Sequence, residues 1–457
     1  MNRRDGLMAT ADATQLFLAS FAGLIAVGTL GFLVVPGMYA GPGLGFVDAL
    51  FTATSAVCVT GLIVVDTASY FTPLGQAWIA LLIQLGGLGI LTFTTLIIHA
   101  LGRRASLHAT EAAGSDASVT DHLDQMAMLK AVLASTLALE TVGAAVLWAD
   151  WSGELGAVGA IWPAVFHAIS AFCNAGFSIF PDSLVGHQQG AITLLGVSGL
   201  VVLGGIGFVV LADLHARWLG GGSVRRRLST HTRLALVTTA ALLAGATALY
   251  LTFEWSHALA GLPPVDRVLN GWFMAVTPRT AGFNTVDYSQ LSNPSLFLTV
   301  MLMVIGGSPG SAAGGLKTTT VALLGLVLWS RLRGRDHVSA FGRTIPAETV
   351  QRAAGLAIGG LAILAIGVFL LSMTELPGAG AGGRSAFLSL IFEAHSAFGT
   401  VGLSMGATGE LSGAGRLVVT ALMYLGRVGP LAVVSAMAAG SSGGVRFRYA
   451  SEDVIIG

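Results

Sequence analysis

Four short apolar segments of the chain place a glycine in the same local setting. Each has an aromatic residue ten positions before the glycine and a large apolar residue directly after it, and three have a serine six positions before it. The segments are FTATSAVCVTGLIVVD with Gly61, FHAISAFCNAGFSIFPD with Gly176, WFMAVTPRTAGFNTVD with Gly282 and FEAHSAFGTVGLSMGA with Gly402. Such repetition indicates one structural unit that occurs four times. Four equivalent turns around one axis would present a ring of backbone carbonyls, which can replace the hydration shell of a cation.

Glycine suits this chemistry for a backbone reason. A strand that directs its carbonyls to one side needs dihedrals that residues with a Cβ disfavour. A short helix before each turn would add the negative end of its dipole, which favours a cation. The alternative is that these glycines only let helices pack closely. One segment alone would fit that alternative, but four aligned segments with a shared aromatic favour the ring.

The composition places these segments in a membrane. Charged residues make up 10% of the 457 residues and apolar residues 54%, whereas a globular protein has about 25% charged residues. The 23 basic and 23 acidic residues cancel. A soluble enzyme of this size, a disordered chain and a protein that binds polyanions through bulk charge are all excluded. We therefore predict a polytopic membrane protein with an unusual content of 62 glycines.

The elements that must position the four turns follow from segment length, since a spanning helix needs about 20 apolar residues. Eight stretches meet this length, at 15–37, 76–100, 126–149, 190–214, 232–254, 295–330, 350–373 and 415–440. Four shorter stretches, at 46–58, 162–173, 268–279 and 387–399, fit re-entrant segments better. We predict an all-α fold of eight transmembrane helices and four re-entrant pore helices around a central pore.

The predicted units divide the chain into four. They are residues 1–110, 120–228, 229–345 with an interruption in its last span, and 346–457 with the C-terminal tail. Most Lys and Arg residues fall in loops on one side of these spans, which by the positive-inside rule is the cytoplasm. Both termini are then expected to be cytoplasmic, and all four pore segments enter from outside.

The fourfold pattern resembles a known family. With CVTGL, CNAGFS, RTAGFNTVD and FGTVGLSMG as filter segments, the chain is similar to the Trk/Ktr/HKT superfamily of potassium transporters over nearly its whole length. Only one span precedes the first pore segment, near residue 46, so the resemblance is closest to the KtrB-type membrane subunits of bacterial Ktr uptake systems.

The resemblance implies a function and its partners. The filter would bind K+ through the carbonyls of Val59, Thr60, Gly61, Asn174, Ala175, Gly176, Thr280, Ala281, Gly282, Thr400, Val401 and Gly402. Glycine at all four key positions implies selectivity for K+ over Na+. A homodimer in the bacterial inner membrane is expected, on a KtrA-like cytosolic ring of RCK subunits that bind an ATP- or ADP-type nucleotide. No cofactor beyond K+, or Na+ in sodium-dependent systems, is expected on this chain, and nucleic acid is not an expected partner.

A second glycine-rich segment interrupts the sixth stretch and matches the family's intramembrane gate. It comprises Gly306, Gly307, Ser308, Pro309, Gly310, Ser311, Ala312, Ala313, Gly314 and Gly315. Five glycines and a proline in ten residues cannot continue a helix, and the apolar flanks place the segment at membrane depth. The alternative is a passive kink for packing.

Charged residues inside the membrane are functional candidates by default. We predict that Arg427 points into the cavity below the filter, where it repels cations and holds the gate closed; a structural ion pair is the alternative. Lys317 either bonds the gate's carbonyls or extends to the cytoplasmic face. Arg279 is predicted to brace the third filter turn.

Other polar residues carry weaker signals. Asp66, Asp182 and Asp287 follow their filter segments and either concentrate cations at the outer mouth or are solvated loop residues. Cys58 and Cys173 fit buried free thiols, and His167 and His395 fit hydrogen-bonded helix residues.

Two other functions are alternatives to the gated pore. A secondary transporter with alternating access needs inverted halves and midplane acids, for which Glu140 and Glu393 are the candidates; coupling to sodium stays open. An intramembrane enzyme needs a nucleophile with its base, or metal ligands, on the spans, and the sequence has neither. We therefore expect a transporter and not an enzyme.

Overall fold

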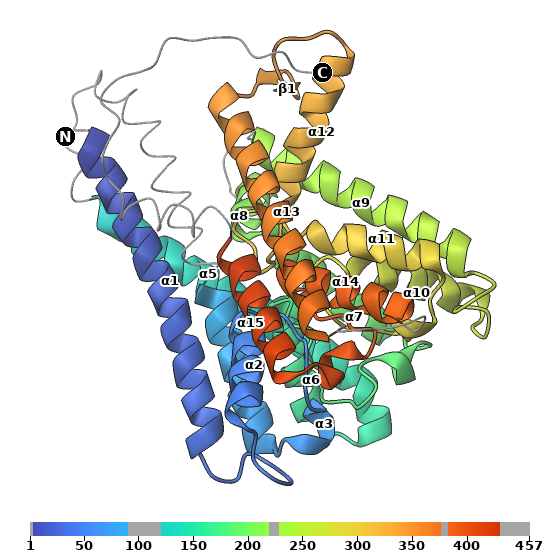
Figure 1. Cartoon of the computed structure of the whole chain (residues 1–457). Coiled ribbons are helices and arrows are strands. Elements are labelled where there is room, and N and C mark those ends of the chain that lie inside the picture. The colour runs from blue at the N-terminus through green and yellow to red at the C-terminus, as the bar shows by residue number, and fades with distance from the viewer. Residues whose placement is uncertain (1–2, 90–119, 219–227, 376–382, 430–457) are drawn as a thin grey trace.

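The computed structural model describes residues 3–89, 120–218, 228–375 and 383–429. Within these ranges the chain is almost wholly helical, and β1 (Ser339–Ala340) and β2 (Arg343–Thr344) are its only strands. Figure 1 shows the helices gathered around shorter central ones, with α1 along one flank and a hairpin of α12 and α13 at the top.

The helices follow one plan in each of four units: a long helix, a short helix that leads into an irregular turn, and a second helix. The first unit contains α1 (Arg3–Val34), α2 (Phe46–Val57), α3 (Thr67–Tyr70) and a helix over Pro73–Gly89. The second contains α5 (Thr120–Leu155), α6 (Ile161–Phe172), η1 (Val185–His187), α7 (Ala191–Ile206) and α8 (Phe208–Trp218). The third contains α9 (Thr230–Glu254), α10 (Pro264–Val276), η2 (Tyr288–Gln290), α11 (Asn293–Val304) and α12 (Thr318–Leu332). The fourth contains α13 (Ala347–Glu375), α14 (Gly383–Gly399), η3 (Ala407–Glu410) and α15 (Gly413–Val428).

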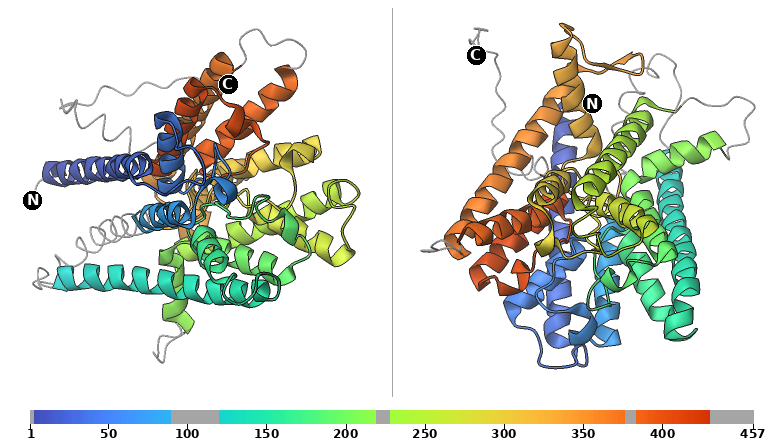
Figure 2. Two further views of the ribbon diagram at one scale, coloured as in Figure 1. Left: turned by 90° about the horizontal axis from the view of Figure 1, so that it is seen from below. Right: turned by 90° about the vertical axis from the view of Figure 1, so that its right-hand side faces the viewer.

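The units join in a closed ring, in which the second helix of each packs against the short helix of the next. The packed pairs are α7 with α10, α11 with α14, and α15 with α2. Between the first and second units, the indole N–H of Trp162 donates to Gln76 Oε1 at 2.8 Å. The views of Figure 2 show the units grouped around this centre.

Polar contacts between helices hold this arrangement together. In three units an acid at the end of the long helix accepts a hydrogen bond from the start of the second helix, at 2.5–2.6 Å between oxygens; the pairs are Asp150 with Thr193, Glu254 with Ser292 and Glu375 with Ser412. Between the fourth and first units, Arg416 Nη1 lies 2.5 Å from Asp48 Oδ1. Glu254 and Glu375 also accept the backbone N–H of Ser292 and Ser412, each at 3.0 Å, and so satisfy a free donor at the start of the second helix.

Four helices are long and apolar enough to cross a membrane within the described residues, or five if the bent pair α7 and α8 is one span. The four are the long helices α1, α5, α9 and α13. The predicted eight spans are therefore not confirmed. The helix over Pro73–Gly89 reaches the limit of a described range, whereas α15 ends at Val428, followed by Gly429 with φ +90°. The predicted stretches 76–100 and 415–440 lie partly outside the described residues.

The prediction of one continuous span over 190–214 is wrong. The helix breaks at Gly207, and α7 and α8 are bent by 97°. Gly207 has φ +94°, a conformation that residues with a Cβ rarely adopt. The interruption predicted in 295–330 is present, because α11 ends at Val304 and α12 begins at Thr318.

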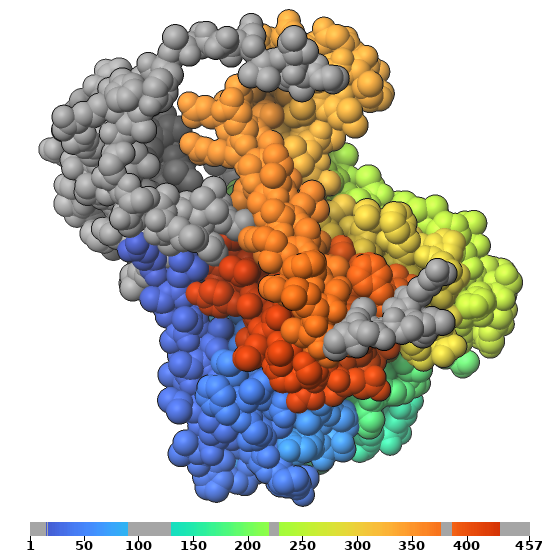
Figure 3. Space-filling view, viewed as in Figure 1, coloured from blue at the N-terminus to red at the C-terminus, as the bar shows by residue number. Residues whose placement is uncertain are grey.

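The segment that connects α12 and α13 forms a short β-hairpin, which projects from the rest of the molecule. Its strands pair antiparallel, Ser339 with Thr344 and Ala340 with Arg343. The space-filling view shows it projecting at one end of the molecule (Figure 3). Near its base, Arg333 lies over the Trp329 ring, 4.4 Å from the ring centroid.

Candidate functional site

The four predicted filter segments adopt the same backbone conformation. In each, the key glycine and the residue two positions before it have positive φ, and the residue between them does not. The φ values are +55° and +90° for Val59 and Gly61, +59° and +71° for Asn174 and Gly176, +68° and +79° for Thr280 and Gly282, and +49° and +94° for Thr400 and Gly402. Positive φ in a residue with a Cβ is strained, so its recurrence in all four units marks a shared local structure.

The four turns close on one another in chain order. A Cβ on Gly176 would lie 2.8 Å from the carbonyl oxygen of Ala281 in the next unit. The other glycines meet their neighbours in the same way, with a Cβ overlapping a carbonyl oxygen: Gly61 with Ala175, Gly282 with Val401, and Gly402 with Thr60. The structure thus brings all twelve predicted filter residues into one ring. Glycine is required there because the next turn occupies the space of a side chain.

Hydroxyl groups on the short helices, or directly after them in the third unit, hold each turn in place. Ser55 and Ser170 donate to the carbonyls of Leu62 and Phe177 at 2.7 Å. In the fourth unit, Ser396 accepts from the backbone N–H of Gly402 at 3.1 Å. In the third unit Thr277 does this work and donates to Phe283 O at 2.5 Å.

Thr277 reveals an offset that the sequence alignment missed. It stands five positions before its glycine, whereas the serines stand six before theirs. The aromatic is displaced with it: Phe273 is 1% exposed, like the fully buried Phe51, Phe166 and Phe392, while Trp272 is only partly buried. The prediction that Trp272 is the equivalent aromatic is therefore wrong, since the third turn is one residue shorter.

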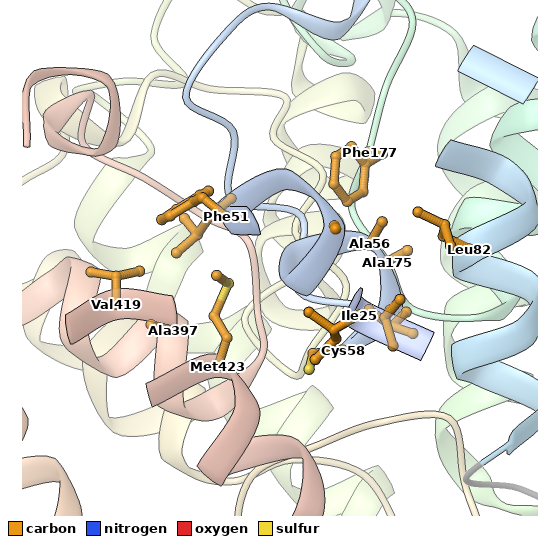
Figure 4. Close-up of a cluster of buried hydrophobic side chains, with 14 of the residues drawn as sticks. Ile25, Phe51, Ala56, Cys58, Leu82, Ala175, Phe177, Ala397, Val419 and Met423 are labelled. Atoms are coloured by element: carbon orange, nitrogen blue, oxygen red, sulfur yellow. The ribbon is translucent and has the colours of Figure 1, made fainter. Parts of the chain in front are cut away.

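Packing around the first short helix shows how the ring is enclosed. Figure 4 shows α2 with Phe51, Ala56 and Cys58, between Ala175 and Phe177 on one side and Ala397, Val419 and Met423 on the other. The second and fourth units therefore both contact the first, as a closed ring requires.

Glycines of the second helices let those helices touch the ends of the short helices. A Cβ on Gly86, Gly204 or Gly426 would overlap a carbonyl oxygen in the last turn of a short helix, at Val57, Phe172 and Phe398 respectively. This agrees with the repeated sequences QLGGLG, VLGGIG and YLGRVG. The close contact supports the carbonyl ends of α2, α6 and α14 from behind.

The predicted gate segment forms a compact loop between α11 and α12. Its two ends meet in a parallel bridge between Ile305 and Leu316. The loop docks on the bend of the second unit: the N–H groups of Ser308 and Ala312 donate to Gly205 O at 2.9 Å and Gly204 O at 3.2 Å. In return, Phe208 N donates to Gly310 O at 2.8 Å. The bend at Gly207 thus presents the backbone that receives the loop.

The loop lies directly against the filter. A Cβ on Gly314 would overlap the Thr400 hydroxyl, and one on Gly306 would lie 3.5 Å from Thr280 Cγ2. Most of the ten residues from Gly306 to Gly315 are buried. In this structure the loop therefore covers one side of the ring, next to Thr280 and Thr400.

Three cationic side chains hold the loop, of which Arg427 and Arg279 are buried and Lys317 is partly buried. Arg427, 2% exposed, donates to Ala312 O and, at 3.2 Å, to Gly86 O. Lys317 Nζ donates to Ala313 O at 2.6 Å, so of its two predicted positions the structure has the one on the loop carbonyls. Arg279 donates to Gly306 O at 3.3 Å and so connects the third turn with the loop.

The other polar residues singled out in the sequence lie outside the ring and the loop contacts, in helix caps, in helices or on the surface. Asp66 and Asp287 accept from backbone N–H groups at the starts of α3 and η2, and Asp182 is exposed. The free thiols of Cys58 and Cys173 are buried, as predicted. His167 and His395 bond carbonyls one helical turn earlier, at 2.8 and 2.7 Å. Within the described residues, no three His, Cys, Asp or Glu side chains form a group that could hold a metal.

Long apolar helices around a ring of four equivalent glycine turns are features of an integral membrane protein, and cation transport is the class that comparison with known proteins gives it. A family model described as TrkH, cation transport protein, matches residues 9–442. The potassium/sodium uptake protein NtpJ of Enterococcus hirae is 38% identical over 415 residues, which cover 90% of either protein.

Two further proteins are similar over most of their length. The Ktr system potassium uptake protein B of Vibrio alginolyticus is 35% identical over 430 residues, 93% of this chain and 91% of the relative. The crystal structure of the potassium transporter TrkH from Vibrio parahaemolyticus matches with a TM-score of 0.72 at 19% identity, covering 93% of this chain and 84% of that one. The chain belongs to the Trk/Ktr family of potassium uptake transporters, and the predicted resemblance is confirmed. It is a transporter and not an enzyme.

Proposed function

We propose that this chain is the K+-translocating subunit of a Ktr-type uptake system. K+ passes the ring of filter carbonyls and then the loop at 306–315, which closes the path in the conformation described. The observation that carries the proposal is the closed ring of four turns with matched φ values and mutual glycine contacts. The membrane potential drives entry, at about 2.3 kcal/mol per charge per 100 mV.

The filter binds K+ through backbone carbonyls, so its selectivity comes from ring geometry and not from side-chain charge. The twelve filter residues lie in four units, at 1–110, 120–228, 229–345 and 346–457, which together span the membrane eight times. Glycine at all four key positions favours K+ over Na+.

Gating depends on the loop and its three cationic side chains. Arg427 opposes a permeating cation and holds the loop closed, and Lys317 stabilises the loop's return to α12. A cytosolic RCK ring with bound nucleotide moves the loop, and the chain works as a homodimer in the bacterial inner membrane with both termini cytoplasmic. Support for a partner comes from the relative named as part of a Ktr system.

The alternative is a sodium-coupled symporter with alternating access. One observation favours it: Glu140 on α5 is only 6% exposed and accepts from Gln84 Nε2 at 3.1 Å. The relative named potassium/sodium uptake protein agrees with sodium involvement. A buried carboxylate at membrane depth is a functional candidate.

Flux measurements on purified protein in liposomes test the proposal. We expect K+ and Rb+ flux to exceed Na+ flux, to follow the electrochemical gradient of K+ alone, and to rise when the RCK partner and nucleotide are added. Uphill K+ movement driven by a Na+ gradient, and its loss in Glu140→Gln, would establish the symporter instead.

A further inference from the structure

The ring of filter turns is braced on its outer side in only two of its four units. The relevant positions are the residue that follows the buried aromatic of each short helix, and the residue two after each key glycine. The short-helix residues are Thr52, His167, Met274 and Glu393. The residues two after the glycines, which we call the rim residues, are Ile63, Ser178, Asn284 and Ser404. All four short-helix residues are buried, at 0–3% exposure.

In the second unit the brace is a histidine. His167 Nδ1 lies 2.8 Å from Pro163 O, and because a carbonyl only accepts, the ring proton sits on Nδ1. Nε2 is then an acceptor and takes the hydroxyl of Ser178 at 2.8 Å. The Ser178 oxygen in turn accepts from Phe180 N at 3.0 Å. The short helix thus holds the turn that follows the filter.

In the fourth unit the brace is a carboxylate with the same connection. Glu393 accepts from the Ser404 hydroxyl, from Met405 N at 3.3 Å and from the Thr408 hydroxyl at 2.6 Å. Ser404 accepts from Gly406 N at 2.9 Å, so both serines cap the backbone N–H two residues on. Two chemically different side chains therefore produce one local structure.

The first and third units have no such brace. The Thr52 hydroxyl is buried without a hydrogen-bond partner, and Ile63 at its rim is 38% exposed. Met274 has no group that could bond Asn284, whose amide donates instead to Val286 O at 3.2 Å. The third rim is held from outside, where Leu184 N donates to Asn284 O at 3.0 Å.

The braced units face each other across the ring. The glycine contacts run from the first unit to the second, third and fourth and back to the first, so the second and fourth are diagonal. Hydrogen bonds to a buried side chain resist displacement of the segments that they join. Two opposed rims are thus fixed to their short helices, while the other two lack this link.

We propose that His167 and Glu393 are positioning residues that set the width of the outer filter and hence its discrimination between K+ and Na+. The inference rests on the proposed function, because it presumes that the ring selects the ion. Neither side chain needs to touch the ion, because each acts through the serine two positions after its filter glycine.

The test compares braced and unbraced units in liposomes, with Rb+ and Na+ flux measured on the same preparation. Glu393→Ala and Ser404→Ala, or His167→Ala and Ser178→Ala, should each lower the ratio of Rb+ to Na+ flux about tenfold, since each leaves a buried partner unsatisfied. Glu393→Gln and His167→Gln, which retain an acceptor, should restore most of the ratio. The matched controls Thr52→Val and Met274→Leu should leave it unchanged.

Paired variants keep the test informative where a single one folds poorly. Ser178→Ala and Ser404→Ala remove only one oxygen each, and each should add nothing once its partner on the short helix is already replaced. If the wild type prefers Rb+ over Na+ and the serine variants keep the same flux ratio, the inference is overturned while the proposed function stands. A wild type without preference for Rb+ over Na+ would overturn the proposed function itself.

Discussion

The filter ring and the loop beneath it both depend on glycine, but they use it differently. In the ring each glycine has positive φ and a neighbouring turn where its Cβ would be. In the loop only Gly310 and Gly315 have positive φ, and Gly306, Gly307 and Gly314 are needed because other groups pack against them.

The two regions also differ in how they are held. Four equivalent units enclose the ring, so every turn is fixed by its own short helix and by the next turn. The loop occurs once and is fixed by a few backbone bonds to the second unit and by Arg427, Lys317 and Arg279. A segment held by a few hydrogen bonds needs less free energy to open than a segment that neighbouring units enclose. Selection therefore fits the ring, and gating fits the loop.

The largest effect is expected in the ring. Gly61→Ser puts a Cβ where Ala175 O lies and imposes a left-handed conformation on serine. Strain of about 1–2 kcal/mol and overpacking of about 1–3 kcal/mol should together shift the K+ to Na+ flux ratio by about a hundredfold. Flux assays in liposomes with each ion measure this.

Gly45→Ala is the matched control, because Gly45 precedes α2 at φ −67° with open space around it. It should keep the wild-type ratio. If Gly61→Ser retained that ratio as well, the ring would not be the selective element, and the distinction between ring and loop would fail.

A smaller effect is expected at the loop, where a substitution should change the rate of K+ flux and not the preference for K+ over Na+. Arg427→Ala removes the bonds to Ala312 and Gly86, and a charge-assisted bond contributes about 1.5–3 kcal/mol. Basal K+ flux without the partner should rise about tenfold at an unchanged ion ratio. Deleting residues 309–313 should act in the same direction.

Arg352→Ala serves as the control for this prediction, since Arg352 is exposed and, among the described residues, forms an ion pair with Glu348 on its own helix. Its flux should match wild type. Equal or lower flux in well-folded Arg427→Ala protein would remove the assignment of the loop as the gate.

The smallest effect concerns the support behind the ring. Gly204→Ala would push a Cβ into Phe172 O, whereas a Cβ on Gly199 in the same helix meets open space. We expect Gly204→Ala to lower stability by about 1 kcal/mol or more, seen as a lower Tm in detergent. Gly199→Ala should match wild type or exceed it, and equal Tm values for both would show that α7 adjusts freely against α6.

The sequence predicted the ring better than the loop's surroundings. The four turns could be found because they repeat, and repetition separates a signal from chance. The bend at Gly207 could not, because GLGIL and GIGFV read as continuous apolar helix and the bend answers a tertiary contact with Gly310. The offset at Thr277 was missed for a related reason: a one-residue deletion in a turn leaves every residue type plausible.

Charge positions were predicted only in part. Arg427 stood out because a guanidinium at membrane depth is rare, and its bond to the loop is present. The partner of Arg279 was not foreseen, because sequence proximity to Gly282 suggested the filter turn while the side chain reaches Gly306. The acid caps of Glu254 and Glu375 went unnoticed, since their serine partners lie 38 and 37 residues away.

The most direct test of the central claim is to locate the ion. Crystals grown in Rb+ and measured at the rubidium absorption edge should show anomalous density on the axis of the ring, among the carbonyls of Thr60, Ala175, Ala281 and Val401. Crystals grown in Na+ should show the site without that density, and K+ should compete with Rb+ for it. Well-diffracting crystals in Rb+ with no anomalous density in the ring, or with density only elsewhere in the chain, would contradict the account.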